Sequence, residues 1–258
     1  MNNFNKRYAI TFGETAILHA GSSEIGSIRE HGFSVEELKK IKEKIKHKSE
    51  LIILSNILPQ NIQKENEAAT LIIRDGVNLL LGSDKTKKLL KEQSNIEYDK
   101  KYFDKRRNKT LNKRARYNIV FGDEEVIHSD DYKKFSIVPF TKLKYLNKIR
   151  KNLINILGEK AKNLNAEGNY YFDNKCGIGF HGDSERKIVI CLSLGESSII
   201  RYNWRMAGSS ERYGSNIDLK INNGDIYIMS EKATGFDWKK RSKVRIVHAA
   251  GSEKYIGK

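Results

Sequence analysis

The chain of 258 residues has little proline, little cysteine and no long apolar run. No stretch approaches the roughly 18 consecutive apolar residues of a membrane-spanning helix, and the first residues lack the apolar segment of a signal peptide. Cys176 and Cys191 are too few and too far apart for a disulfide framework or a cysteine zinc site. We therefore expect a protein of a reducing, intracellular compartment, with no membrane partner and with both cysteines in the core.

Positive charge is in excess, because 48 Lys and Arg residues face 32 Asp and Glu residues, a net charge of +16. Such an excess is typical of proteins with an anionic partner, and nucleic acid is the first candidate. The chain is also rich in lysine, asparagine and isoleucine, as expected from an A+T-rich coding sequence. Codon composition is therefore a second explanation for part of the lysine content.

The cations are concentrated between residues 85 and 116, where aromatic residues are interleaved with them. Cations that neutralise phosphates, next to rings that stack on bases, are typical of a groove for single-stranded nucleic acid. The alternative is a solvated, partly disordered linker. The residues that we assign to nucleic-acid binding are Arg106, Arg107, Lys109, Lys113, Arg114, Arg116 and Tyr117.

Residues 1–95 have the pattern of a small α/β accessory region, whose role the sequence does not indicate. A capping box of Ser34 and Glu37 predicts the start of an amphipathic helix. We interpret His19 and His31 as structural residues. The strands predicted in this region are 8–12, 51–54 and 69–73.

Residues 96–258 are dominated by β signals, after an amphipathic helix predicted at 141–157 that ends at Gly158. Short strands separated by turn residues are typical of an antiparallel sandwich or jelly roll. The predicted fold class is therefore α+β, a jelly roll preceded by the small α/β region. The predicted strands are 170–172, 177–181, 187–194, 198–204, 216–221, 225–229 and 243–248.

The segment that contains His181, Gly182 and Asp183 has the H-x-D pattern on a predicted strand. Residues two apart on a strand point to the same side, so His181 and Asp183 can reach one metal ion. With the distant His248 they form a two-histidine, one-carboxylate set, which holds Fe(II) by one face and leaves three positions open. A surface histidine beside a turn aspartate is the competing interpretation, because H-x-D also occurs by chance.

Three runs carry a resemblance to a known family: GNYYFDNKCGIGFHGDSERKIVICLSLG, NNGDIYIMSEKATGFDWKKR and VHAAGSEKY. They resemble the AlkB-like 2-oxoglutarate- and Fe(II)-dependent dioxygenases, in the version found in large DNA viruses. The resemblance covers the C-terminal 90 residues and implies a double-stranded β-helix, the jelly roll named above. The run at 112–123 is similar to the segment that lies over the substrate base in these enzymes.

The resemblance implies a function and its cofactors. Fe(II) would be held by His181, Asp183 and His248, and 2-oxoglutarate and O2 would be co-substrates. The reaction would remove N-methyl groups from bases of single-stranded DNA or RNA, releasing succinate, carbon dioxide and formaldehyde. A base inside a duplex cannot reach the metal, so it must be flipped or already single-stranded. We expect a monomer, in the cytoplasm or nucleus of a host cell if the protein is viral.

The resemblance also implies co-substrate residues. Asn169 and Tyr171 match the N-x-Y motif that binds 2-oxoglutarate, and Arg186 fits the viral signature and would help to organise the site. Two departures stand out: His248 lies eight residues later than in cellular relatives, and the chain ends before the usual carboxylate-binding arginine. The candidates for that anchor are Arg241, Arg245, Lys254 and Lys258.

Two alternatives remain open from the sequence. One is an oxygenase of this chemistry that hydroxylates a protein or a small molecule, in which case the basic stretch is linker. The other is a jelly roll that binds nucleic acid without turnover.

Overall fold

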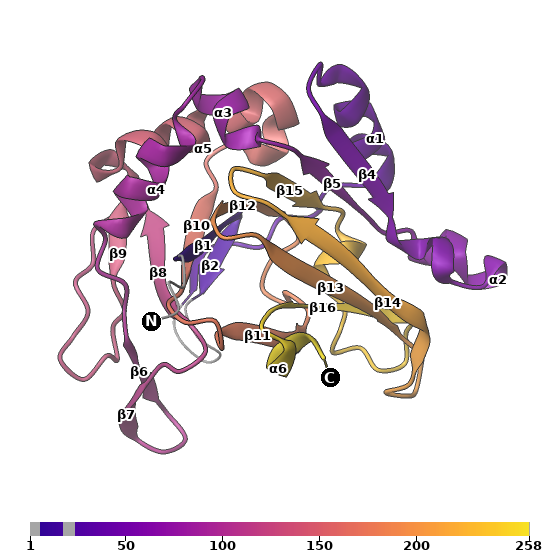
Figure 1. The fold of residues 1–258 in the computed structure, drawn as a ribbon. Helices are drawn as coiled ribbons and strands as arrows, with labels where there is room; N and C mark the ends of the chain where they lie inside the picture. The colour runs from indigo at the N-terminus through magenta and orange to yellow at the C-terminus, as the bar shows by residue number, and fades with distance from the viewer. Residues whose placement is uncertain (1–5, 18–23, 258) are drawn as a thin grey trace.

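The computed structural model of the protein describes residues 6–17 and 24–257 (Figure 1). Most of its regular structure lies in two β-sheets, one of eight strands and one of four. The larger sheet contains, from edge to edge, β4 (Ser49–Ile53), β5 (Ala69–Ile73), β15 (Ile226–Met229), β12 (Val189–Gly195), β1 (Arg7–Gly13), β10 (Asn165–Tyr171), β8 (Tyr117–Gly122) and β9 (Ile137–Pro139). The smaller sheet contains β11 (Gly177–His181), β16 (Arg245–Gly251), β13 (Ser198–Arg205) and β14 (Arg212–Ile221).

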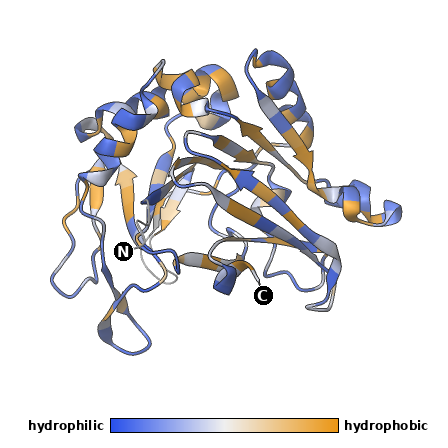
Figure 2. Cartoon of the chain, viewed as in Figure 1, coloured by the Kyte–Doolittle hydropathy of each residue, from blue (hydrophilic) through white to orange (hydrophobic). Residues whose placement is uncertain are grey.

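Neighbouring strands in both sheets are antiparallel, except for β8 and β9. The inner faces of the two sheets share an apolar cluster that includes Ile72 and Met229 from the larger sheet and Trp204 and Ile246 from the smaller one. The strands of the smaller sheet alternate between hydrophilic and hydrophobic residues (Figure 2), as expected for strands with one buried face. The structure is therefore mixed α/β and mostly sheet.

Helices cover the other face of the larger sheet (Figure 1). Leu38, Leu80, Leu89 and Leu146, one from each of the four longest helices, belong to the same apolar cluster as Ile10 of β1. Within the described residues, no helix has the length and apolar character needed to cross a membrane. The helices are α1 (Val35–Lys44), α3 (Gly76–Leu81), α4 (Thr86–Ser94) and α5 (Lys144–Leu157), with the short α2 (Gln60–Gln63) and α6 (Glu253–Ile256) outside this layer.

Two hairpins complete the described structure. β2 (Thr15–Ile17) pairs with β3 (Glu24–Gly26), and β6 (Lys101–Asp104) pairs with β7 (Lys109–Asn112). The β6–β7 hairpin projects away from the sheets (Figure 1) and belongs to the basic stretch. The stretch is therefore folded into α4 and this hairpin, in contrast to the linker alternative.

Many of the predicted elements are confirmed. The strand at β1 and the strand at β11 have the predicted positions, and Ser34 forms the predicted capping box with Glu37. The basic amphipathic helix ends at Gly158, which has the positive φ of +75° that favours glycine. The predicted division at residue 95 is wrong, because β1, β4 and β5 are strands of the larger sheet and do not form a separate region.

The central strand β1 lies between β10 and β12 and pairs with both. Its side chains alternate: Ile10 and its neighbours Tyr8 and Phe12 are buried under the helices, whereas Ala9 and Thr11 face the smaller sheet. The N-terminal segment therefore supplies the middle of the sheet and part of its inner face.

We predict that Ile10→Ala lowers the free energy of unfolding of the whole protein by about 2–5 kcal/mol, the usual cost of removing a fully buried aliphatic side chain. Urea unfolding, followed by far-UV circular dichroism and by tryptophan fluorescence, measures it. Ile28→Ala, at a side chain that is 48% exposed, is the matched control and should change the free energy by less than about 0.5 kcal/mol. Two separate transitions, with only one shifted by Ile10→Ala, would contradict the integration of β1.

Candidate metal centre

The side chains of His181, Asp183 and His248 converge between the two sheets. His181 and His248 are cross-strand neighbours in β11 and β16, and Asp183 follows β11 directly. Their donor atoms all lie within 4.8 Å of one another. Nε2 of His181 is 3.5 Å from Asp183 Oδ1, and Nε2 of His248 is 3.9 Å from the same oxygen. Donors that each lie about 2.1 Å from a shared ion are at most about 4.2 Å apart, and the two distances to Asp183 are within that limit. The three residues are therefore a group that could hold a metal ion.

The hydrogen bonding of His181 and the protonation state of His248 are both compatible with metal binding. Nδ1 of His181 is 2.8 Å from the Gly179 carbonyl oxygen, so Nδ1–H donates to it and Nε2 is left as the ligand atom. Burial, and then the proximity of His181 and Arg186, lower the pKa of His248 well below its usual value. His248 is therefore neutral near pH 7, which is the form that binds metal.

The local backbone explains why glycine separates His181 from Asp183. A Cβ atom on Gly182 would lie 2.2 Å from the carbonyl oxygen of Gly235, so only glycine permits this close approach. The Asp183 N–H donates to the Thr234 carbonyl at 2.9 Å. The turn at 234–235 therefore holds the H-x-D segment in place.

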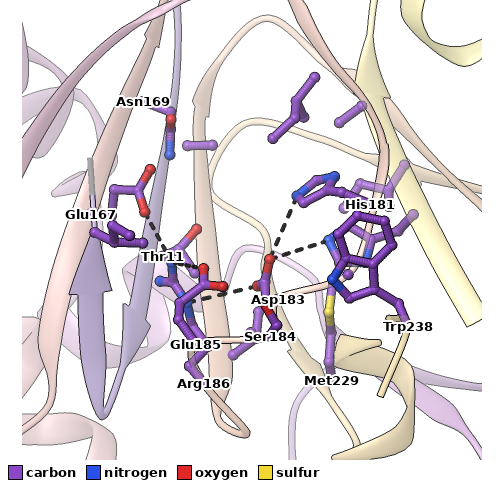
Figure 3. Close-up of a pocket in the computed structure, with 18 of the residues that line it drawn as sticks. Thr11, Glu167, Asn169, His181, Asp183, Ser184, Glu185, Arg186, Met229 and Trp238 are labelled. Atoms are coloured by element: carbon purple, nitrogen blue, oxygen red, sulfur yellow. Dashed lines mark hydrogen bonds and ion pairs between the residues drawn. The ribbon is translucent and has the colours of Figure 1, made fainter. Parts of the chain in front are cut away.

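A buried charge cluster lies behind Asp183 (Figure 3). Nη2 of Arg186 donates to Glu167 at 3.0 Å and to Glu185 at 2.9 Å, and its Nε is 3.9 Å from Asp183 Oδ2. Among the described residues, Nε and Nη1 of Arg186 have no hydrogen-bond partner although both are buried. Arg186 thus faces the metal ligand Asp183 and keeps unused donors.

The metal-ligand group lies in a cavity of about 490 Å³. Ala9, Thr11, Val189 and Ile200 from both sheets contribute to its walls. Trp238 lies beside the histidine and aspartate side chains in Figure 3, and its Nε1 is buried and has no partner among the described residues. The cavity is therefore lined by both sheets, is partly open to the surface, and has both apolar and polar groups in its lining.

The N-x-Y residues Asn169 and Tyr171 both line this cavity from β10. Oδ1 of Asn169 accepts hydrogen bonds from Arg116 Nε and from Asn118 Nδ2, each at 2.5 Å. The Arg7 guanidinium stacks on the ring of Tyr171, with its carbon 3.7 Å from the ring centroid. Both residues therefore lie in the same cavity as His181, Asp183 and His248.

The predicted carboxylate anchors lie elsewhere. Arg245 donates to the carbonyls of Met206 and Ser209, and Lys254 lies over the ring of Tyr255 on α6. Arg241 is exposed. These three residues do not belong to the described lining of the metal cavity, and Lys258 lies outside the described residues. The cations that do line it are Arg116, Arg186 and Lys239.

The predicted nucleic-acid residues fall into three groups. Arg106 and Lys109 are exposed near the turn of the β6–β7 hairpin, and the ring of Tyr117 stacks on Phe172. The other four line a second groove, beside the hairpin: Arg107, Lys113, Arg114 and Arg116. Of these, Arg116 also lines the metal cavity.

Sequence reasoning missed Ala9, Thr11 and Glu167 as cavity residues. The sequence of β1 has the period-two pattern of a strand, which places Ala9 and Thr11 on one face. No local signal indicates which strands lie beside β1, so the role of that face could not be read from the chain. His31 forms a surface ion pair with Glu30, and His19 lies outside the described residues.

Comparison with known proteins gives one informative relative. The chain matches no protein-family model. It is 38% identical over 261 residues to an uncharacterized protein of Acanthamoeba polyphaga mimivirus, and the match covers 99% of this chain and 100% of the relative.

We predict that His181→Ala abolishes binding of a divalent metal without unfolding the protein. Mutation of residues that hydrogen-bond to metal ligands typically weakens metal affinity by roughly 10- to 100-fold. Removal of a ligand itself should weaken the affinity by more than this. Calorimetric titration of metal-free protein with Mn(II) measures this, and circular dichroism reports the fold. His31→Ala is the control, since its imidazole is at the surface. Equal Mn(II) affinity in His181→Ala would exclude this centre.

A second prediction concerns Lys113, whose side chain is only 8% exposed and whose ammonium has no partner among the described residues. Burial lowers the pKa of Lys113 from 10.5 to about 8, against an opposing effect of Asp99. Below pH 8 the folded protein therefore carries a buried charge that the unfolded chain keeps in water. As the pH rises from 8 to 10.5, only the folded state loses its proton, so this cost disappears.

We expect Lys113→Met to be more stable than the parent protein by up to about 3 kcal/mol at pH 7, and the difference should shrink as the pH approaches 10. Urea unfolding of both proteins in phosphate-free buffer between pH 7 and 10 measures it. A difference that is independent of pH would show that Lys113 is not buried as a charge.

Proposed function

The chain belongs to the same protein family as the mimivirus protein, and we propose that its His–Asp–His centre catalyses 2-oxoglutarate- and Fe(II)-dependent demethylation of N-alkylated bases in single-stranded nucleic acid. A viral relative is consistent with the resemblance to the dioxygenases of large DNA viruses. The observation that carries the proposal is the convergence of His181, Asp183 and His248 in one cavity. Two imidazoles and one carboxylate on one side of an open cavity suit Fe(II) with exchangeable positions.

The strand order supports a double-stranded β-helix. From β10 to β16 the chain alternates between the larger and the smaller sheet, with β13 and β14 as a hairpin in the smaller one. The next strand of this pattern would return to the larger sheet. β1 lies between β10 and β12, at the position where that strand would lie. On this interpretation the N-terminal strand completes the jelly roll.

The cavity has groups that fit a dicarboxylate co-substrate. The guanidinium of Arg186 already faces Glu167, Glu185 and Asp183, so its role in this proposal is to hold the side chain of Asp183 in place. Asn169 and Arg116 lie on the opposite wall, linked by their hydrogen bond. These residues would hold 2-oxoglutarate next to the metal ligands.

We assign the distal carboxylate to Arg7 in place of the candidates Arg241, Arg245 and Lys254. Arg7 lines a neighbouring pocket that shares Tyr171 with the metal cavity, and it lies on the same face of β1 as the cavity residues Ala9 and Thr11. Its side chain is 8% exposed and stacks on Tyr171, and it has no carboxylate partner among the described residues. A buried, unpaired guanidinium beside a cavity tyrosine is suited to bidentate carboxylate binding.

Iron with 2-oxoglutarate and O2 would supply the oxidising power that hydroxylates an N-methyl carbon. The protein has to position the methyl group and exclude water. The apolar side chains of Val189 and Ile200 serve the second task, and a cavity of about 490 Å³ can enclose a base-sized group. The C–N bond of the N-hydroxymethyl group would then break. The group leaves as formaldehyde, and its hydroxyl proton passes to the base nitrogen.

The decisive experiment measures succinate and formaldehyde from 2-oxoglutarate, Fe(II) and O2, with a single strand that contains 1-methyladenine. We expect stimulation by the methylated strand, no stimulation by the same strand without the methyl group, and no product with His181→Ala. Stimulation by neither strand, with steady succinate release, would move the target to a protein or small molecule. No turnover in protein that binds Mn(II) would overturn the proposal.

The same assay tests the anchor. Arg7→Met should raise the KM for 2-oxoglutarate by about 10- to 100-fold, the usual effect of losing a charge-assisted hydrogen bond. Arg241→Met is the matched control, and Arg7→Lys should recover part of the affinity. A raised KM in Arg241→Met, with Arg7→Met unchanged, would return the anchor to the C-terminal segment.

A further inference from the structure

A second groove, of about 960 Å³, lies between the β6–β7 hairpin, the segment that leads into β8, and α6. The hairpin projects from the sheets on this side of the molecule (Figure 1). The groove is built by residues far apart in the sequence, since Tyr255 of α6 joins the hairpin and the segment that follows it in the lining. The residues that carry charge or aromatic rings in its lining are Lys101, Tyr102, Arg107, Lys113, Arg114, Arg116 and Tyr255.

The charge of this groove is of one sign. Five cations line it, no carboxylate belongs to its described lining, and among the described residues Arg107 alone of the five forms an ion pair, with Asp104 at 3.8 Å. The groove beside Phe33 differs, because three of its lysines pair with carboxylates: Lys160 with Glu37, Lys187 with Glu231, and Lys232 with Asp237. Unbalanced positive charge is therefore a property of the hairpin groove and is not general to the surface.

Among the cations of the groove, Lys113 has the strongest physical reason to bind an anion. Its side chain is more than nine-tenths buried, and its Nζ has no hydrogen-bond partner among the described residues. A buried ammonium without a partner is unfavourable. An anion in the groove would supply both the opposite charge and the missing hydrogen bonds.

The groove continues into the metal cavity at Arg116. This residue lines both spaces, and its Nε is fixed by the hydrogen bond to Asn169 on the cavity wall. A ligand that extends along the groove as far as Arg116 would therefore lie next to the metal cavity.

Aromatic rings accompany the cations. The ring of Tyr255 lies against Gly177, where a Cβ atom would be 2.5 Å from it, so glycine permits the ring to lie there. Tyr102 lines the opposite wall. Rings beside a run of cations are typical of surfaces that bind single strands, because every base can stack.

We infer that this groove binds the phosphodiester backbone of a single strand, that Lys113 contacts the phosphate nearest the metal cavity, and that Arg116 marks where a base leaves the strand to enter the cavity. The inference rests on the proposed function for the identity of the strand as substrate. An acidic peptide would match the cations, but it would leave the two rings and the connection to a base-sized cavity without a role.

The test is binding of a fluorescein-labelled single strand of about 12 unmodified nucleotides to metal-free protein in EDTA, followed by fluorescence anisotropy between 50 and 200 mM salt. Lys113→Met should raise the Kd by about tenfold and reduce the slope of log Kd against log salt by about 0.7, the value for one phosphate contact of a single strand. Lys101→Met should act in the same direction.

Lys148→Met and Lys151→Met are the matched controls. Both lysines are exposed on α5, and each substitution removes the same charge away from the groove. Their Kd values should stay within about twofold of the parent. Unfolding of each variant by urea shows that loss of binding is not loss of fold, and Lys113→Met is expected to be the more stable protein.

The outcomes separate this inference from the proposed function. Equal loss in the α5 variants, or no loss in Lys113→Met, would overturn the groove as the site. Poly-glutamate that competes as well as the unlabelled strand would identify an acidic peptide as the ligand, which also overturns the inference. Selective loss of binding in Lys113→Met supports the groove even if the succinate assay fails, because no iron is present.

Discussion

The fold and the candidate site both depend on the position of β1 between β10 and β12. Its backbone pairs with both strands, its Ile10 face joins the core under the helices, and its Thr11 face forms a wall of the metal cavity. β10 carries Asn169, and β12 begins soon after Arg186. A strand from the N-terminus therefore holds together two segments that lie far along the chain, and the cavity cannot form without it.

Charge balance at the cavity favours a bound cation. Asp183, Glu167 and Glu185 surround the single guanidinium of Arg186. Arg116 and Lys239 balance the charge of the cavity lining as a whole, but in the buried group around Arg186 three carboxylates face one guanidinium, a local excess of two negative charges. Buried charges require compensation, and a divalent ion between Asp183 and two neutral imidazoles would supply it. The arrangement of Arg186 then has a clear role, since it orients the ligand Asp183 and limits the repulsion among the carboxylates.

The elements were largely predictable from the sequence, but their association was not. The capping box at Ser34, the helix stop at Gly158 and the alternation in β11 are local features, and each one is present in the structure. The meeting of His181 and His248 also followed from their residue types and the H-x-D spacing. In contrast, the partners of β1 depend on pairing across more than 150 residues, which no local pattern encodes. For the same reason the sequence indicated a separate N-terminal region, whereas β1, β4 and β5 are strands of the larger sheet.

The distribution of lysine and arginine decides between the two explanations of the net charge. Codon composition can set how many lysines the chain contains, but it does not decide which of them lie beside carboxylates. In the groove near Phe33, three lysines have acidic partners, as expected for an ordinary solvated surface. In the hairpin groove the cations have no carboxylate among the described lining, and one of them, Lys113, is buried. A buried charge without a hydrogen-bond partner lowers stability, and this cost is the physical basis for proposing an anionic ligand of the groove.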